Sequence, residues 1–395
     1  MLWAQVCSLA AVQGAIALLW VIYNLYLVDL LVRFGFPAAL ATGLLIVENL
    51  LALVMEPLMG SLSDRLQQRL GTKFPLISLG VILTAGIFLC LPVIALQGLE
   101  AAFRWILPMM MVAWALAMTV FRSPALSLLG RYAFNTHLPQ AASVLTLVGG
   151  VAGAMGPLAS DLILGWGPTV AFVIGSGILL VAAGCLRFSG PQASITPETD
   201  LVPGAAFSQP SISWPCLVLV FGAGAGITLG FRLLMTLFSR VLQEQAPDAN
   251  RGLVLGCIFV ALAVTAIPAG TLATRLGNRR AMVLGLAGMA FVYALLGVVH
   301  QSAIAMGLAV IFGATYSLSA NGTIPFALSM VPPSKAGLGT GMFFSGGAAA
   351  ASLFGAIAST IKTLPLSLGI FMGILALLLA GICITRSPNR LLPLA

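Results

Sequence analysis

Long apolar runs separated by short polar breaks dominate this chain. Twelve of these runs reach the length of about 20 residues that a helix needs to cross a membrane. They cover residues 3–29, 37–63, 73–96, 103–130, 137–164, 167–188, 213–243, 250–274, 279–299, 303–330, 336–361 and 364–386. The runs are unbroken and rich in Leu and Ala, whereas β-barrel strands show short alternating segments. The pattern therefore predicts an all-α membrane protein with twelve transmembrane helices.

The longest polar stretch divides these runs into six and six. Residues 189–212 are rich in Pro, Gly, Ser and acidic side chains, which suit an exposed linker rather than a membrane span. We therefore expect an N-terminal six-helix bundle over 1–188, a cytoplasmic linker over 189–212 and a C-terminal six-helix bundle over 213–395.

Two similar basic segments follow the second run of each half. The first contains Gly-Ser-Leu-Ser-Asp-Arg at 60–65, and the second contains Gly-Thr-Leu-Ala-Thr-Arg at 270–275. Each segment continues with Leu-Gly and further basic residues. Matching segments at matching places indicate an internal repeat, as in transporters whose two helical bundles are related by pseudo-twofold symmetry.

The composition supports the membrane assignment. The chain of 395 residues is 60% hydrophobic and 7% charged, whereas soluble domains carry about 25% charged residues. Its outer surface must therefore face lipid. The net charge of +8 comes from basic residues scattered over short loops, so it indicates the positive-inside bias and not nucleic-acid binding. The bias predicts an inner or plasma membrane protein with both termini cytoplasmic.

Motifs for catalysis, metal binding and nucleotide binding are absent from the sequence. The six cysteines show no Cys-x-x-Cys spacing, which argues against a disulfide framework or a zinc site. No Gly-x-x-x-x-Gly-Lys-Ser/Thr loop is present, so ATP is not expected to drive the protein. We expect no cofactor and no enzymatic activity.

The paired segments resemble the loop signature of the major facilitator superfamily. The first copy matches it with Gly60, Asp64, Arg65, Gly71 and Lys73. The second copy matches it with Gly270, Arg275, Gly277, Arg279 and Arg280, and has Thr274 in place of the acid. The resemblance covers nearly the whole chain. It implies a secondary transporter that works by alternating access.

Two details point to different branches of that family. The additional residues between Arg65 and Leu70, followed by Pro75, resemble the sugar–cation symporters, including sucrose-type carriers. Gly153, Gly156 and Pro157 resemble part of the signature of drug–proton antiporters. A sugar- or glycoside-like solute is therefore the first expectation, and proton-coupled efflux of amphipathic compounds is the alternative. A non-transporting membrane assembly factor or sensor is the alternative from another class.

The basic segments suggest a conformational latch. A carboxylate at Asp64 can accept bonds from backbone N–H groups at the start of a neighbouring helix, where the helix dipole favours negative charge. We expect Asp64, Arg65 and Arg69 to form this latch, with Arg275 and Arg279 in the second copy. The alternative is that these charges only set the membrane topology.

Four ionisable residues fall inside predicted spans, where a charge costs about 2.5–3.5 kcal/mol on the insertion scale. Glu48 and Glu56 lie in the second run, Arg122 in the fourth and Arg232 in the seventh. Glu48 is a candidate for coupling transport to an ion such as a proton or sodium. Glu56 is either a second coupling residue or the ion-pair partner of Arg122.

The family resemblance also implies which spans line the central cavity, namely the first, fourth, seventh and tenth. The polar and aromatic residues of these spans are the candidates for substrate binding: Gln13, Tyr23, Asn24, Trp114, Arg122, Arg232, Tyr316, Ser319 and Asn321. Amide, hydroxyl and ring groups suit a sugar, whereas two arginines suit an anion. The expected partners are this small-molecule substrate, a coupling ion and membrane lipid, with the protein acting as a monomer.

Overall fold

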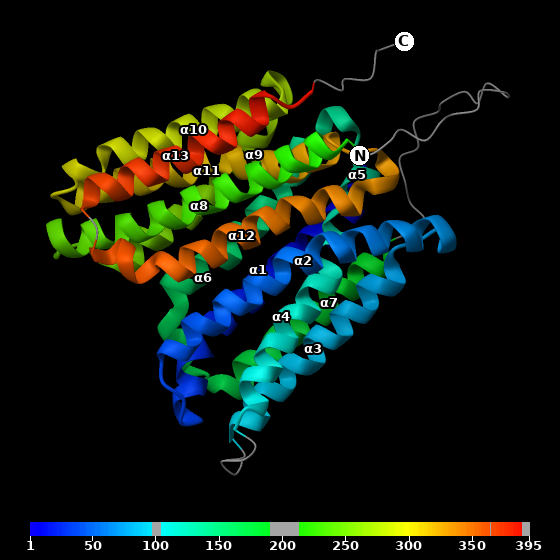
Figure 1. Cartoon of the computed structure of the whole chain (residues 1–395), viewed down its shortest axis with the longest axis horizontal. Coiled ribbons are helices and arrows are strands. Elements are labelled where there is room, and N and C mark those ends of the chain that lie inside the picture. Colours follow the sequence, from blue (N-terminus) through cyan, green and yellow to red (C-terminus); the bar gives the residue numbers. More distant parts are fainter. Residues whose placement is uncertain (97–103, 190–212, 364, 389–395) are drawn as a thin grey trace.

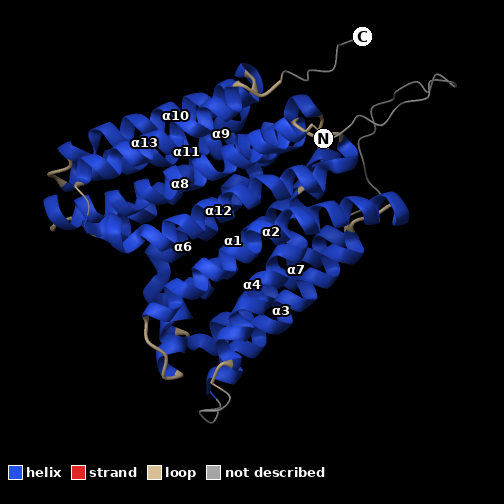
Figure 2. Ribbon diagram, viewed as in Figure 1, coloured by secondary structure: helices blue, strands red, loops and turns tan. Residues whose placement is uncertain are grey.

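A computed structural model describes residues 1–96, 104–189, 213–363 and 365–388. Helices make up the architecture throughout these ranges, and no strand occurs in them (Figure 2). Twelve helical segments are long and apolar enough to span a membrane, which confirms the predicted fold class. The chain is therefore an integral, multi-pass membrane protein. The expected linker lies outside the described residues except for Ser189.

The ends of the twelve spans lie within seven residues of those read from the sequence. The α-helices are α1 (Trp3–Arg33), α2 (Ala39–Leu70), α3 (Phe74–Leu96), α4 (Ile106–Leu126), α5 (Leu129–Tyr132), α6 (Leu138–Gly165), α7 (Gly167–Phe188), α8 (Trp214–Gln245), α9 (Arg251–Leu276), α10 (Asn278–Leu295), α11 (Ser302–Ser329), α12 (Ala336–Thr363) and α13 (Leu366–Thr385). Short 3₁₀ turns are η2 (Asn135–His137), η3 (Leu296–Val298) and η4 (Pro333–Lys335). Helices α4 and α5 together form one span.

The helices form two groups, α1–α7 and α8–α13, and each group surrounds its own apolar core. The groups meet along α2 with α12 and along α6 with α9. Figure 1 shows them converging toward the side where the N-terminus lies and diverging away from it. Helices α2 and α12 are the second and eleventh spans, and α9 and α6 are the eighth and fifth. The two pairs are therefore related by a shift of six spans. This is the relation expected of a duplicated six-helix unit.

Helix α2 is longer than the sequence pattern predicted. It continues through the polar residues after position 63 and ends at Leu70, where Gly71 adopts the left-handed conformation with φ 72°. Asp64, Arg65 and Arg69 therefore lie on the last turns of a helix and not in a loop. The physical reason is that this stretch contains no residue that breaks a helix before Gly71, which suits the positive φ of a helix end.

One row of residues on α2 is buried from end to end. Residues 44, 48, 52, 56, 60 and 64 follow each other at intervals of four, and all of them are buried. Residues spaced four apart form a ridge that winds slowly around a helix. The ridge therefore faces different neighbouring helices along its length, and it carries the three carboxylates Glu48, Glu56 and Asp64.

Candidate functional site

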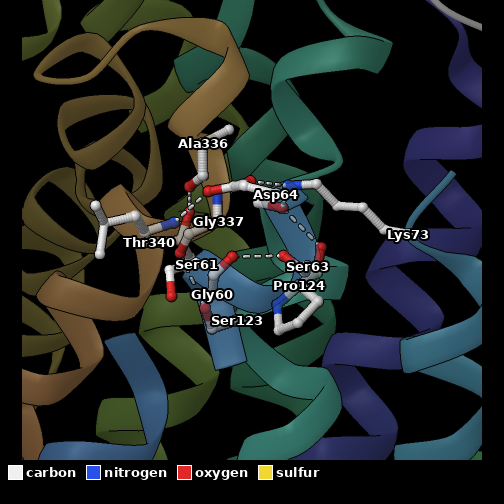
Figure 3. A network of polar contacts seen from close by, with 12 residues as sticks. Gly60, Ser61, Ser63, Asp64, Lys73, Ser123, Pro124, Ala336, Gly337 and Thr340 are labelled. Carbon is white, nitrogen blue, oxygen red and sulfur yellow. Dashed lines mark hydrogen bonds and ion pairs between the residues drawn. The ribbon is translucent and has the colours of Figure 1, made fainter. Parts of the chain in front are cut away.

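Asp64 joins the two halves of the molecule. Its Oδ1 accepts a hydrogen bond from the backbone N–H of Gly337 at 2.9 Å, and its Oδ2 accepts one from Leu338 at 2.9 Å. Both donors belong to the first turn of α12, where N–H groups have no partner within the helix and the dipole favours an anion. Figure 3 shows this carboxylate from α2 between α12 and Lys73. The side chain caps a helix of the other half.

The cation that pairs with Asp64 is Lys73, which we did not include in the expected latch. Its Nζ lies 2.7 Å from Asp64 Oδ1 and donates to Ser127 Oγ at 2.7 Å. Lys73 and Asp64 are each 1% exposed. Burial lowers the pKa of the Lys73 ammonium, and the Asp64 carboxylate opposes that effect. We refer to Asp64, Lys73, Ser127, Gly337 and Leu338 as the Asp64 cluster.

Arg65 and Arg69 do not join this cluster. Both side chains are exposed, because successive residues of a helix point in different directions and only position 64 lies on the buried ridge. Lys73 follows Gly71, after the helix has ended, and this turn of the chain brings its ammonium back to Asp64. The sequence signal that could have identified Lys73 was its position in the first basic segment.

The backbones of α2 and α12 approach closely beside the cluster. A Cβ atom added to Gly337 would collide with the carbonyl oxygen of Gly60, and one added to Gly60 would collide with the carbonyl of Gly337. Ser123 Oγ donates to the same Gly337 carbonyl at 3.1 Å (Figure 3). Glycine at both positions therefore permits the short distance that Asp64 needs in order to reach α12.

The second basic segment does something different. Arg279 donates to the backbone carbonyls of Ser387 at 2.8 Å and of Pro388, just beyond the end of α13. Arg275 is exposed, and the hydroxyl of Thr274 donates to the Gly270 carbonyl of its own helix. We expected Arg275 and Arg279 to belong to a latch between the halves, but these contacts do not join the two halves. Without an acid at position 274, this segment lacks the group that could cap a helix.

Glu56 and Arg122 form an ion pair between α2 and α4. Arg122 donates to Glu56 Oε1 from Nε at 2.8 Å and from a terminal nitrogen at 2.5 Å. Glu56 is fully buried, while Arg122 retains 20% exposure and lies 4.6 Å from the ring centroid of Phe344 on α12. Arg122 is thus already engaged by an anion and a ring, which leaves it little capacity to bind a substrate anion.

Glu48 has no cation beside it among the described residues. Tyr23 on α1 donates a hydrogen bond to Glu48 Oε1, and both side chains are buried. Trp114 on α4 packs on Tyr23 with ring centroids 4.4 Å apart, and Trp20 lies 5.0 Å from Trp114. The structure therefore brings three of the sequence candidates, Tyr23, Trp114 and Glu48, into one aromatic cluster inside the N-terminal half.

Three other candidates bond to backbone carbonyls, which does not resemble a binding site, and a fourth keeps an unbonded amide oxygen. Ser319 and Asn321 are buried and donate to the backbone carbonyls of Met282 at 3.3 Å and Ala266 at 2.7 Å, so they tie helices together. Asn24 is exposed and donates to Trp20 in its own helix at 2.7 Å. Gln13 is partly buried beside Gly149, and its Oε1 has no hydrogen-bond partner among the described residues.

Arg232 and Tyr316 line a cavity of about 460 Å³. The other lining residues are Thr228, Phe231, Met235, Thr236 and Phe354, from α8 and α12. The rings of Phe231 and Tyr316 are stacked with centroids 4.3 Å apart. Arg232 is exposed to this space and makes no hydrogen bond or ion pair within the described chain. Sequence reasoning missed Phe231 and Phe354, because an apolar side chain on a membrane helix carries no signal of its own.

A second cavity of about 470 Å³ adjoins the first. It shares Met235 and Thr236 with the first cavity and extends along α8 toward Gln243. Arg240 and Glu244, which form an ion pair at 2.7 Å, and Arg251 also line it. Helix α8 runs from the side where the two groups converge toward the side where they diverge (Figure 1), and this cavity follows it in that direction.

Comparisons with known proteins identify the fold. No protein-family model matches the sequence, and no curated protein sequence matches it. Among solved structures, the chain is similar to a bacterial homologue of the iron transporter ferroportin in its outward-facing state with soaked iron, with a TM-score of 0.72 and 15% identity over 97% of this chain and 99% of that one. The outward-facing state of such a homologue gives a TM-score of 0.71 and 15% identity over 97% and 98%. In fold, this chain is therefore a twelve-helix membrane protein of the major facilitator type.

Proposed function

We propose that this chain is a secondary transporter that moves a small organic anion across the membrane by alternating access. The fold is one in which two six-helix halves alternately expose a central site. The Asp64 cluster joins the halves on one side, and the cavities lie toward the other. This asymmetry is the arrangement expected of one end state of such a cycle.

Arg232 is the single observation that carries the choice of substrate. A charge within a membrane helix is costly and marks a functional site by default. The other intramembrane arginine, Arg122, is neutralised by Glu56, whereas Arg232 faces a cavity without a bonded partner in the described ranges. A carboxylate or phosphate would neutralise it through paired hydrogen bonds. The stacked rings of Phe231 and Tyr316 favour an anion that also has a flat apolar part.

A sugar is less well supported than an anion. Among the polar candidates that could bind hydroxyls, Ser319 and Asn321 already bond to backbone carbonyls. The solved structures with this fold do not favour the sugar–cation branch either, since they are homologues of an iron transporter. We therefore keep a sugar as an alternative substrate, which the thermal-shift measurement can detect, and not as the first choice.

A metal ion is the second candidate because the similar structures are homologues of an iron transporter. Two observations favour the anion over it. Within the ranges that the structure describes, no three His, Cys, Asp or Glu side chains gather in a way that could hold a metal ion. In addition, Arg232 places a positive charge in the cavity, which repels a cation.

A thermal-shift measurement on the purified protein tests these choices, because a ligand stabilises the state that binds it. The probes are benzoate and phthalate as anions, glucose and sucrose as sugars, and Fe²⁺ and Mn²⁺ as metals. We expect stabilisation by an aromatic carboxylate, with affinity reduced at least tenfold in Arg232→Gln. The matched control is Arg69→Gln, which removes an exposed arginine on α2.

Other results would assign a different function. Stabilisation by Fe²⁺ or Mn²⁺ alone would replace the anion by a metal, and stabilisation by sucrose alone would restore the sugar. An aromatic carboxylate that binds wild-type and Arg232→Gln protein equally would contradict the role of Arg232. Binding without flux in proteoliposomes would favour the non-transporting sensor.

A further inference from the structure

The three carboxylates on the buried ridge of α2 differ in what neutralises them. Asp64 has Lys73 and the first turn of α12, and Glu56 has Arg122. Glu48 has only the neutral hydroxyl of Tyr23 within the described chain. Glu48 is also 3% exposed, and its Oε2 has no hydrogen-bond partner there. Burying an ionised carboxylate without a cation is far costlier than burying the neutral acid.

Among the described residues, the surroundings of Glu48 contain no charge that could balance it. On α1 the nearest titratable group is Tyr23, which bonds to it. The nearest charged groups on α2 and α4 are Glu56 and Arg122, two helical turns along the ridge and already paired with each other. The α12 side chains that bond to α2 along this stretch are neutral: Ser352 donates to the Ile46 carbonyl and Ser345 to the Leu53 carbonyl.

The aromatic cluster separates Glu48 from water. Tyr23, Trp114 and Phe88 are each at most 1% exposed, and Phe88 stacks on Trp114 with centroids 5.1 Å apart. The indole N–H groups of Trp20 and Trp114 are buried without an acceptor in the part of the chain that the structure describes. A sodium ion needs several oxygen ligands, whereas rings surround this carboxyl group. A proton needs only the carboxyl oxygen itself.

We infer that Glu48 is the proton-carrying group of this transporter and that Tyr23 positions its carboxyl. The inference rests on the proposed transport function. In the present state Glu48 is the neutral acid. When the halves rearrange and water reaches the cluster, the O–H bond of the acid breaks, the proton passes to water, and the resulting carboxylate accepts the hydrogen bond of Tyr23. Reprotonation is required before the site closes again.

Tryptophan fluorescence provides a test that needs no substrate. Trp114 packs on Tyr23, so a change in the charge of Glu48 alters the field at its indole. The purified protein is titrated between about pH 5 and pH 9 in detergent. We expect a single sigmoidal change in emission that Glu48→Gln abolishes and that Trp114→Phe strongly reduces. The control Asp29→Asn alters an exposed acid on α1 and should leave the curve unchanged.

Tyr23→Phe keeps the test decisive if Glu48→Gln fails to fold. This variant retains the carboxyl and removes the donor that stabilises its charged form, so the midpoint of the emission change should move to higher pH. If the Tyr23–Glu48 hydrogen bond were purely structural and Glu48 did not titrate, the emission curve would have no midpoint that this substitution could shift. An emission curve that is flat in the wild type, or identical in Glu48→Gln, overturns the inference.

Coupling is then measured in proteoliposomes with labelled benzoate as the probe. In Glu48→Gln we expect at least a tenfold loss of accumulation driven by a pH gradient, while benzoate exchange between equal pH values persists. Accumulation at the wild-type level would contradict the coupling role. If the emission titration depends on Glu48 but benzoate does not bind, the proton site stands and the organic-anion proposal fails.

Discussion

Asp64 and Gly337 are separated by 273 positions in the sequence, and a 2.9 Å hydrogen bond joins the Asp64 carboxylate to the Gly337 backbone N–H. The bond links the end of α2 in one half to the start of α12 in the other. It can exist only while the halves are close on this side. The Asp64 cluster should therefore stabilise one conformation of the protein more than it stabilises the fold of either half.

Asp64→Asn tests this expectation. The amide keeps the size of the side chain but loses the charge that Lys73 and the α12 helix dipole stabilise. Charge-assisted hydrogen bonds contribute about 1.5–3 kcal/mol, so the ratio of closed to open conformations should fall roughly tenfold or more. Distance distributions between spin labels at positions 69 and 334, in a cysteine-free background, measure that ratio.

The control for that experiment is Arg65→Gln. Arg65 neighbours Asp64 in the sequence but is exposed, so the distance distribution should match that of the parent protein. An equal shift in both variants would mean that the overall charge of this surface, and not the capping contact, holds the halves together.

Lys73→Met tests which cation completes the cluster. Removing one member of a buried pair leaves the other charge buried and costs about 3–5 kcal/mol. Arg69→Met removes an exposed cation from the same segment and should change stability by about 0.5 kcal/mol at most. Apparent melting temperatures in detergent compare the two variants. A larger loss in Arg69→Met would restore the latch that the sequence suggested.

Gly337→Ala tests the close approach of α2 and α12. The added methyl group would collide with the Gly60 carbonyl and lie 2.8 Å from Asp64 Oδ1, so the closed conformation should be strongly disfavoured in the same spin-label measurement. Gly86→Ala is the matched control, because no atom lies within 4 Å of the position its Cβ would take. That substitution should stabilise α3 by up to about 1 kcal/mol.

A double-mutant cycle on Glu56 and Arg122 tests their ion pair. Glu56→Met or Arg122→Met alone leaves an unpaired charge within the membrane and should cost about 3–5 kcal/mol. The double variant leaves no charge behind and should recover most of the lost stability, measured as the free energy of unfolding in detergent. Additive losses would show that the two side chains act independently.

The sequence by itself determined the number of membrane spans and their helical nature. Apolar length is a local property, since a run of about 20 apolar residues can satisfy its backbone in lipid only as a helix. It also placed the ionisable residues within the membrane, because a charge in an apolar run is visible without any knowledge of packing. From the sequence, pairing with Arg122 was one of two roles expected for Glu56, because both residues are ionisable and lie inside predicted spans.

Only the tertiary structure decided how those residues are used. Position 64 is buried and positions 65 and 69 are exposed because α2 continues past the apolar run as a helix, which the polar sequence did not indicate. Lys73, and not Arg65 or Arg69, pairs with Asp64 because the chain turns at Gly71. Arg122 and Arg232 look alike in the sequence, yet one meets Glu56 and the other faces a cavity. Such differences depend on which side chains from distant segments come within a few ångströms, and no local pattern contains that information.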